Sequence, residues 1–175
     1  MSADSLLSFG RADTADVPQL VNLIHLCFAE LAVLTPPSGA AGETLESISA
    51  LLEKGAIFKA LAGDQLVGCV VAEDKGAEIY IGRLAVRPDC RRQGIAGQLL
   101  AAAEDYARAR GAARLTLNVR LVLSGNIRLF EGAGYRVTGQ GSHPGFAVPT
   151  FHIMQKDLTF QGWSAVPCLC GSPIV

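Results

Sequence analysis

The chain has 175 residues, half of them hydrophobic, so we expect one domain with a sizeable core. A formal net charge of −1 excludes the strongly basic surface that nucleic-acid-binding proteins carry. Its apolar runs fall far short of the ~20 residues that cross a bilayer, and the N-terminus lacks the features of a signal peptide, so we expect a cytoplasmic protein without a membrane partner.

Hydrophobic periodicity in the first half of the chain predicts a strand, two helices and a three-strand meander. Asp13 and Asp16 provide N-cap chemistry, and an apolar stripe with a 3.6-residue period runs from Leu20 to Leu31. Two strands that flank the turn Gly63-Asp64 form a predicted hairpin. In order, the expected elements are a strand over 6–11, a helix that ends before Pro36-Pro37-Ser38-Gly39, a helix over about 44–54, and strands over 56–62, 65–73 and 78–86.

The second half continues with a helix, a strand, a short helix and two final strands. The long helix has Ile95, Leu99 and Tyr106 on one face and ends at Gly111. These elements are expected over 95–110, 114–119, 126–132, 135–138 and 151–158. The order predicts a mixed α/β domain over residues 1–158 with one central sheet. Residues 159–175 show no clear period, and we expect a tail or a covering arm there.

A glycine-rich turn, Arg91 to Gly97, connects the last meander strand to the long helix. The first N–H groups of a helix have no partners within it and carry partial positive charge. Gly94 and Gly97 lack a Cβ, so a bulky anion can approach the backbone. Arg91 and Arg92 add two charges suited to phosphate. The chain has neither a Walker loop nor a complete Rossmann fingerprint, so the turn indicates another kind of phosphate site, with an ordinary helix-capping loop as the alternative.

The cysteines favour buried thiols over a redox or metal site. The chain has five, an odd number. Cys27 and Cys69 lie among apolar residues and are most simply buried. Cys168-Leu169-Cys170 is too tightly spaced for a redox or zinc motif, and we therefore expect no metal.

Two stretches of the sequence match motifs of a known family. One is Arg91-x-x-Gly94-x-Ala96, preceded by Leu84-Ala85-Val86-x-Pro88, and the other is Asn126-x-x-Leu129-Phe130-Glu131-x-x-Gly134-Tyr135. Both occur in the family's order and at a matching spacing, so the chain resembles the GCN5-related N-acetyltransferases (GNAT) over about residues 6–158. The resemblance implies a mixed, mostly antiparallel sheet flanked by helices, and acetyl-CoA as co-substrate.

The resemblance also implies which residues hold the cofactor. Backbone groups of Leu84 and Val86 would pair with the pantetheine arm, and N–H groups of the glycine-rich turn would hold the pyrophosphate. A main-chain N–H near that strand would stabilise the oxyanion that forms during acyl transfer. The complete expected set is Leu84, Ala85, Val86, Arg91, Arg92, Gln93, Gly94, Ile95, Ala96, Gly97, Asn126 and Phe130.

Two positions depart from the family pattern. Phe130 stands where the family frequently has a tyrosine general acid, so the proton for the departing thiolate must come from another source; Tyr135 is a less favoured substitute. Tyr80 stands where the family frequently has a glutamate base, eleven residues before Arg91. Glu78 lies on the same face two residues earlier, so Tyr80 and Glu78 are both candidate bases, each with a structural role as the alternative.

The expected acceptor site lies in loops that face the thioester. Ser38 belongs to the loop between the first two helices, where the family usually shapes its acceptor pocket. Arg120 ends the strand after the long helix and is a candidate for binding an acceptor carboxylate. His143, in the loop between the last two strands, is a candidate acid or base and a candidate acceptor contact. An exposed surface position is the alternative for both Arg120 and His143.

These features together predict an N-acetyltransferase that moves the acetyl group of acetyl-CoA to a primary amine of a small molecule by direct attack. Cys90 adjoins the signature, but we expect no covalent acyl-enzyme on it. A non-catalytic acyl-CoA-binding or sensor module is a second hypothesis, favoured by Phe130. A transferase acting on a protein N-terminus or lysine is a third, and the sequence also permits a homodimer.

Overall fold

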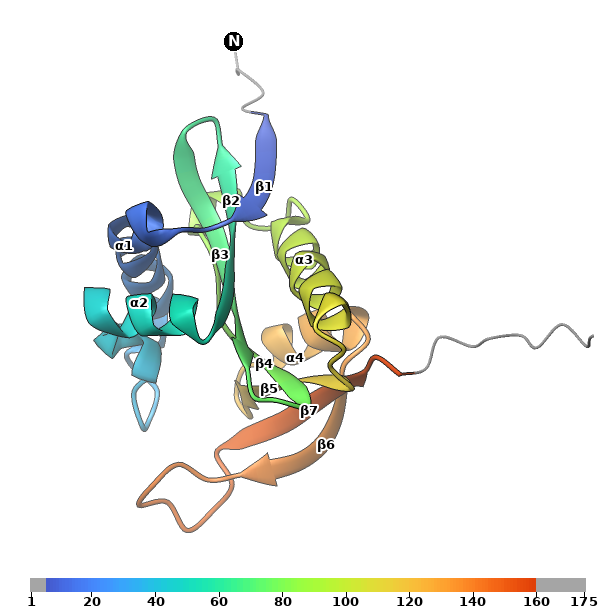
Figure 1. The fold of residues 1–175 in the computed structure, drawn as a ribbon. Coiled ribbons are helices and arrows are strands. Elements are labelled where there is room, and N and C mark those ends of the chain that lie inside the picture. The colour runs from blue at the N-terminus through green and yellow to red at the C-terminus, as the bar shows by residue number, and fades with distance from the viewer. Residues whose placement is uncertain (1–5, 160–175) are drawn as a thin grey trace, which may run out of the picture.

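The computed structural model describes residues 6–159 and has one seven-stranded sheet (Figure 1). The strands are β1 Leu7–Arg11, β2 Gly55–Ala62, β3 Gln65–Asp74, β4 Glu78–Val86, β5 Arg114–Arg120, β6 Arg136–Gly141 and β7 Phe151–Asp157. They lie in the order β1-β2-β3-β4-β5-β7-β6, and β4 with β5 is the one parallel pair among them. The expected fold class, a mixed and mostly antiparallel sheet, is confirmed.

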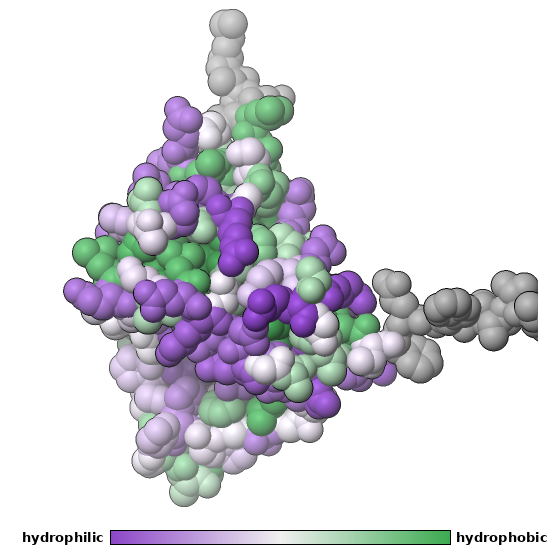
Figure 2. Space-filling view, in the orientation of Figure 1, coloured by the Kyte–Doolittle hydropathy of each residue, from purple (hydrophilic) through white to green (hydrophobic). Residues whose placement is uncertain are grey.

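Helices cover both faces of this sheet (Figure 1). They are α1 Val17–Phe28, α2 Leu45–Glu53, α3 Ile95–Ala109 and α4 Ser124–Gly132. α1 packs on β3, β4 and α2, whereas α3 packs on β2, β3 and β4 from the other side. Each face has its own cluster of buried apolar side chains. Figure 2 shows a face on which polar residues predominate, as expected when the apolar residues lie inside.

Several element boundaries differ from the predicted ones. α1 ends at Phe28, and a 3₁₀ turn over Ala29–Leu31 continues its apolar stripe. α4 begins at Ser124, so Asn126 lies in its first turn. β6 begins after Tyr135 and runs to Gly141, because Tyr135 leaves the sheet to pack edge-to-face on Phe130, with ring centroids 5.8 Å apart. These shifts reflect tertiary packing, which local periodicity does not contain.

The parallel strands β4 and β5 pair at one end and then separate. Their register joins Glu78 to Arg114 and continues only as far as Tyr80 and Thr116. Beyond Tyr80, the edge of β4 that faces β5 has no partner strand within the described residues. On the opposite edge, β4 carries a β-bulge: two residues, Arg83 and Leu84, lie opposite one residue of β3.

Side chains from three other segments hold the bulge at Arg83, whose φ is +50°. Glu43, with a side chain only 6% exposed, accepts a hydrogen bond from Nε of Arg83 at 2.5 Å, and Nη2 of Arg83 lies 2.5 Å from the same carboxylate oxygen. Ser47 donates its hydroxyl to the other carboxylate oxygen of Glu43. The Sγ of Cys69 donates to the Arg83 carbonyl at 3.6 Å, and burial raises the pKa of this thiol to about 12. Cys69 and Cys27 are both buried, which confirms that expectation.

The helices of residues 6–159 are too short or too polar to cross a membrane. The same residues contain no group of three or more His, Cys, Asp or Glu side chains placed to hold a metal ion. Apart from Thr159, the expected tail or covering arm lies outside the described residues.

Candidate functional site

Two adjoining cavities lie where β4 and β5 separate. The larger, here called the α3 groove, has a volume of about 520 Å³ and lies between the end of α1, the second half of β4, the start of α3, and α4. The smaller, here called the β5 cavity, has a volume of about 230 Å³ and lies between β4, the end of β5 and two loops. They share the lining residues Phe28, Leu31, Leu84, Leu123, Asn126 and Phe130. A ligand that fills the groove can therefore present one end to the cavity.

The start of α3 forms one end of the α3 groove. Arg92 and Gly94 have left-handed backbone conformations, with φ of +63° and +77°, which turn the chain from β4 into the helix. The first hydrogen bond of the helix runs from the N–H of Gln98 to the carbonyl of Gly94. The N–H groups of residues 95–97, which line the groove, thus have no acceptor within the helix. Their partial positive charge suits a phosphate group.

Two glycines determine how closely α3 and a ligand approach the sheet. A Cβ on Gly68 of β3 would lie 3.0 Å from Ile95 Cγ2 and 3.1 Å from Leu99 Cδ1, so glycine lets α3 seat tightly on β3. A Cβ on Gly97 would meet no protein atom within 4 Å, because it would project into the open groove. This space beside unpaired N–H groups fits the pyrophosphate of an acyl-CoA.

The signature arginine, Arg91, connects the turn to the end of α1. Its Nε donates to the Val86 carbonyl at 3.1 Å, and its Nη1 to Glu30 at 3.0 Å. Both side chains of this ion pair are about half exposed, at 42% and 52%, so water weakens it. Glu30 places a carboxylate in the lining of the groove, where an anionic ligand has to compete with it.

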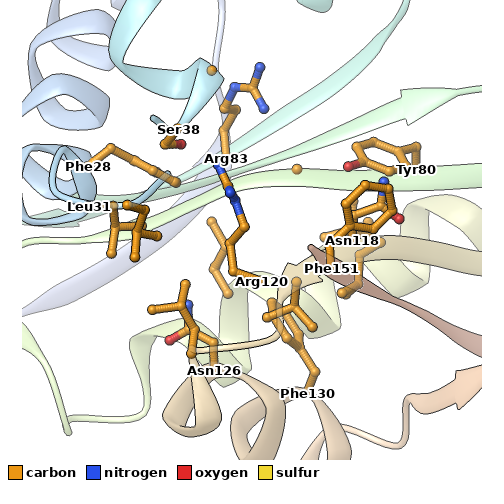
Figure 3. Close-up of a pocket in the computed structure, with 18 of the residues that line it drawn as sticks. Phe28, Leu31, Ser38, Tyr80, Arg83, Asn118, Arg120, Asn126, Phe130 and Phe151 are labelled. Carbon is orange, nitrogen blue, oxygen red and sulfur yellow. The ribbon is translucent and has the colours of Figure 1, made fainter. Parts of the chain in front are cut away.

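The β5 cavity gathers polar side chains that lie far apart in the sequence. Figure 3 shows Arg120 near its centre, with Phe28, Leu31 and Ser38 on one side and Tyr80, Asn118 and Phe151 on the other. Arg83 and His143 also line it, and none of the Asp and Glu side chains of residues 6–159 does. The lining therefore combines apolar and polar side chains and has a net positive charge.

Two titratable groups of the cavity are uncharged at neutral pH. Burial raises the pKa of Tyr80 above that of an ordinary phenol, so its hydroxyl keeps its proton. Burial, helped by the charge of Arg120, lowers the pKa of His143, so its imidazole is neutral. The Nδ1 of His143 lies 2.5 Å from the Thr150 hydroxyl, which leaves Nε2 as its free ring nitrogen among the described residues.

The structure brings together most of the site residues expected from the sequence. Ser38, Tyr80, Arg120 and His143 line the β5 cavity, although four separate segments contribute them. Every expected cofactor residue except Gln93 lines the α3 groove; Gln93 is exposed outside it. The lining cofactor residues are Leu84, Ala85, Val86, Arg91, Arg92, Gly94, Ile95, Ala96, Gly97, Asn126 and Phe130.

Three other candidates are in different surroundings. Glu78 lies at the paired start of β4 and lines neither cavity. Tyr135 also lines neither cavity; its hydroxyl is buried without a hydrogen-bond partner among the described residues, and burial raises its pKa. Cys90 lines the α3 groove, but burial and then Asp89 raise the pKa of its thiol, which disfavours the nucleophilic thiolate.

Sequence reasoning missed several residues of the site. The sequence pattern predicts Phe28 and Leu31 as ordinary members of an apolar helix stripe, yet both line the two cavities. Arg83 has no local signal, because neither its left-handed backbone nor its partner Glu43 follows from neighbouring residues. Glu30 reads as a surface carboxylate, and only the approach of α1 to the turn after β4 places it in the groove.

Comparisons with known proteins agree with this geometry. The model of the Acetyltransferase (GNAT) family matches residues 24–135. The probable N-acetyltransferase 14 of Xenopus tropicalis is 31% identical over 87 residues, which are 49% of this chain and only 42% of that protein's length. The ribosomal-protein-S18-alanine N-acetyltransferase of Escherichia coli has the same fold, with a TM-score of 0.71, 20% identity, and coverage of 91% of this chain and 98% of that one. So does the PaiA N-acetyltransferase of Thermoplasma acidophilum, solved with coenzyme A, with a TM-score of 0.72, 16% identity, and coverage of 87% and 99%.

Proposed function

The chain belongs to the acetyltransferase (GNAT) family, and from this we propose that it transfers the acetyl group of acetyl-CoA to the primary amine of a small molecule. The observation that carries the proposal is the pair of adjoining cavities at the free edge of β4. One has a helix start suited to phosphate, and the other has room for a separate acceptor. A transferase needs two such sites that meet at the reacting atoms.

Acetyl-CoA fits the α3 groove as an extended ligand. Its pyrophosphate would accept hydrogen bonds from the N–H groups of residues 95–97, with Arg91 and Arg92 beside it. Its pantetheine arm would run along the unpaired edge of β4, where Leu84 and Val86 offer main-chain groups as an added strand would require. The PaiA N-acetyltransferase, which has the same fold, was solved in complex with coenzyme A, and this supports acetyl-CoA as the ligand.

Direct attack requires an uncharged amine. The amine nitrogen would form a bond to the thioester carbon, the C–S bond would break, and coenzyme A would leave as a thiolate that takes up a proton. The positive lining of the β5 cavity disfavours an ammonium ion and so favours the free amine. Neutral His143 is suited to accept the amine proton, and protonated Tyr80 to donate one or to hold a water.

The small volume of the β5 cavity supports a small acceptor. At about 230 Å³ it lies below the ~300–1,000 Å³ typical of ligand pockets.

One observation favours a different function, a non-catalytic acyl-CoA-binding module. Phe130, which lines both cavities, has no hydroxyl to protonate the thiolate, and such a module would not need one. Release of free thiol from acetyl-CoA in the presence of amines separates the two functions.

The first test is calorimetric titration of acetyl-CoA and coenzyme A into the wild type, Gly97→Glu and Gly10→Glu. A Cβ at either glycine meets no protein atom within 4 Å, so both variants should fold, which thermal melting checks. Only Gly97 lines the groove, and a carboxylate there should weaken binding at least about tenfold through repulsion of the phosphates. A wild-type protein that binds neither ligand would refute the proposal.

A further inference from the structure

The charge of the β5 cavity comes from one arginine. Arg83 and Arg120 both line the cavity, and no Asp or Glu side chain of the described residues lines it. Arg83 is neutralised, because it forms an ion pair with Glu43, in which Nε donates a hydrogen bond at 2.5 Å and Nη2 lies 2.5 Å from the same carboxylate oxygen. No carboxylate of residues 6–159 forms an ion pair with Arg120. The cavity thus presents the uncompensated charge of Arg120.

Arg120 is held in one orientation by backbone groups. Its Nη2 donates to the carbonyl oxygens of Pro36, at 2.6 Å, and Pro37, at 3.1 Å. Carbonyl groups orient a guanidinium without cancelling its charge. Its Nε and Nη1 have no hydrogen-bond partner in the described part of the chain. These two donors lie on different sides of the guanidinium, so a carboxylate oxygen can accept a charge-assisted hydrogen bond from either of them.

Apolar side chains flank Arg120 on two sides. Phe28 and Leu31 lie on one side of it and Phe151 on the other (Figure 3). Arg120 reaches this position because β5 no longer pairs with β4 beyond Thr116, so the end of β5 faces the opening between the strands. A partly buried charge without a counter-ion is costly, and an anionic ligand would offset that cost.

We propose that Arg120 binds a carboxylate of the acceptor, so that the acceptor is an amine with a carboxylate and an apolar body. That is the chemistry of a free amino acid with an aliphatic or aromatic side chain. The inference rests on the proposed acetyltransferase activity and adds a substrate class to it. The carboxylate pairs with Arg120, the apolar side chain contacts the aromatic walls, and the amine points toward the wall shared with the α3 groove.

The test compares acceptors that differ only in the carboxylate. Thiol release from acetyl-CoA is measured with leucine and phenylalanine, and with leucinamide and phenylalaninamide, for wild type, Arg120→Met, Arg120→Lys and Arg114→Met. Arg114 begins the same strand but lines neither cavity, so Arg114→Met is the matched control. Calorimetry with acetyl-CoA checks the groove of each variant.

Wild type and Arg114→Met should prefer each amino acid over its amide by about 10- to 100-fold in kcat/KM, the range for a charge-assisted hydrogen bond. In Arg120→Met this ratio should fall to near one while acetyl-CoA still binds, and Arg120→Lys should keep part of it. A loop that is merely displaced would slow both acceptors equally and leave the ratio unchanged.

Equal rates with amino acids and amides in the wild type, or an unchanged ratio in Arg120→Met, would overturn the inference and leave the acetyltransferase activity standing. Acetyl-CoA binding without acetylation of any of the four compounds would overturn it as well. Failure of the wild type to bind acetyl-CoA is a different outcome, which removes the proposed function itself.

Discussion

Replacing Glu43 by Gln tests whether the ion pair behind β4 maintains the bulge at the site. Gln keeps the volume of the side chain and its hydrogen bond with Ser47, but it removes the charge that Arg83 contacts. Arg83 would then remain in a left-handed conformation, φ +50°, without its counter-ion. The protein should lose stability, and acetyl-CoA should bind more weakly because the edge of β4 would lose its support.

The magnitude follows from the burial of the pair. Removal of one partner of a buried ion pair costs about 3–5 kcal/mol. The side chain of Glu43 is 6% exposed but that of Arg83 is 32% exposed, so water recovers part of the loss. We therefore expect a decrease of about 2–3 kcal/mol in the free energy of unfolding. At about 2–4 °C per kcal/mol for a chain of this size, Tm should fall by about 4–12 °C.

The assay is a double-mutant cycle with Glu43→Gln, Arg83→Gln and the double variant, followed by denaturant unfolding. The two changes should be coupled by at least about 1 kcal/mol, because both remove the same pair. Glu53→Gln is the control: Glu53 is an exposed residue at the end of α2 and should change stability by less than about 0.5 kcal/mol. Additive effects, or a Glu43→Gln variant as stable as the control, would refute the reasoning.

Three further substitutions probe the α3 groove, the ion pairs of Glu104 and the β5 cavity. Glu30→Gln releases Arg91 and removes a negative charge from the groove, so acetyl-CoA should bind up to about fivefold tighter at low salt and no tighter in 1 M salt, as measured by calorimetry. Burial alone would raise the pKa of Glu104, but its hydrogen bonds, chiefly from Lys156, hold that pKa below the ordinary 4.5. Below about pH 4.5 the unfolded chain therefore binds more protons than the folded chain, which lowers the free energy of unfolding. The stability difference between wild type and Glu104→Gln should shrink in this range, as measured by denaturant unfolding from pH 6 to 3. Tyr80→Phe should reduce kcat about 10- to 100-fold without changing acetyl-CoA affinity; full turnover would exclude a role for Tyr80 in proton transfer.

The sequence by itself determined the elements and the anion-binding turn. Periodicity places Leu20, Ile24 and Cys27 on one helix face and identifies the hairpin around Gly63, because these signals act between neighbouring residues. The turn from Arg91 to Gly97 is also local: glycine positions and the start of a helix suffice to expose unpaired N–H groups. The family motifs lie in such local segments.

Only the tertiary structure decided which side chains share the β5 cavity. Glu78 and Tyr80 lie two residues apart on one strand and are therefore expected on the same face, yet only Tyr80 lines the cavity. The difference depends on where β4 stops pairing with β5, a strand more than thirty residues away in the sequence. The meeting of Arg120 with the carbonyls of Pro36 and Pro37 spans over eighty residues. Contacts of this range arise when strands and loops pack, and no local pattern contains the register that sets them.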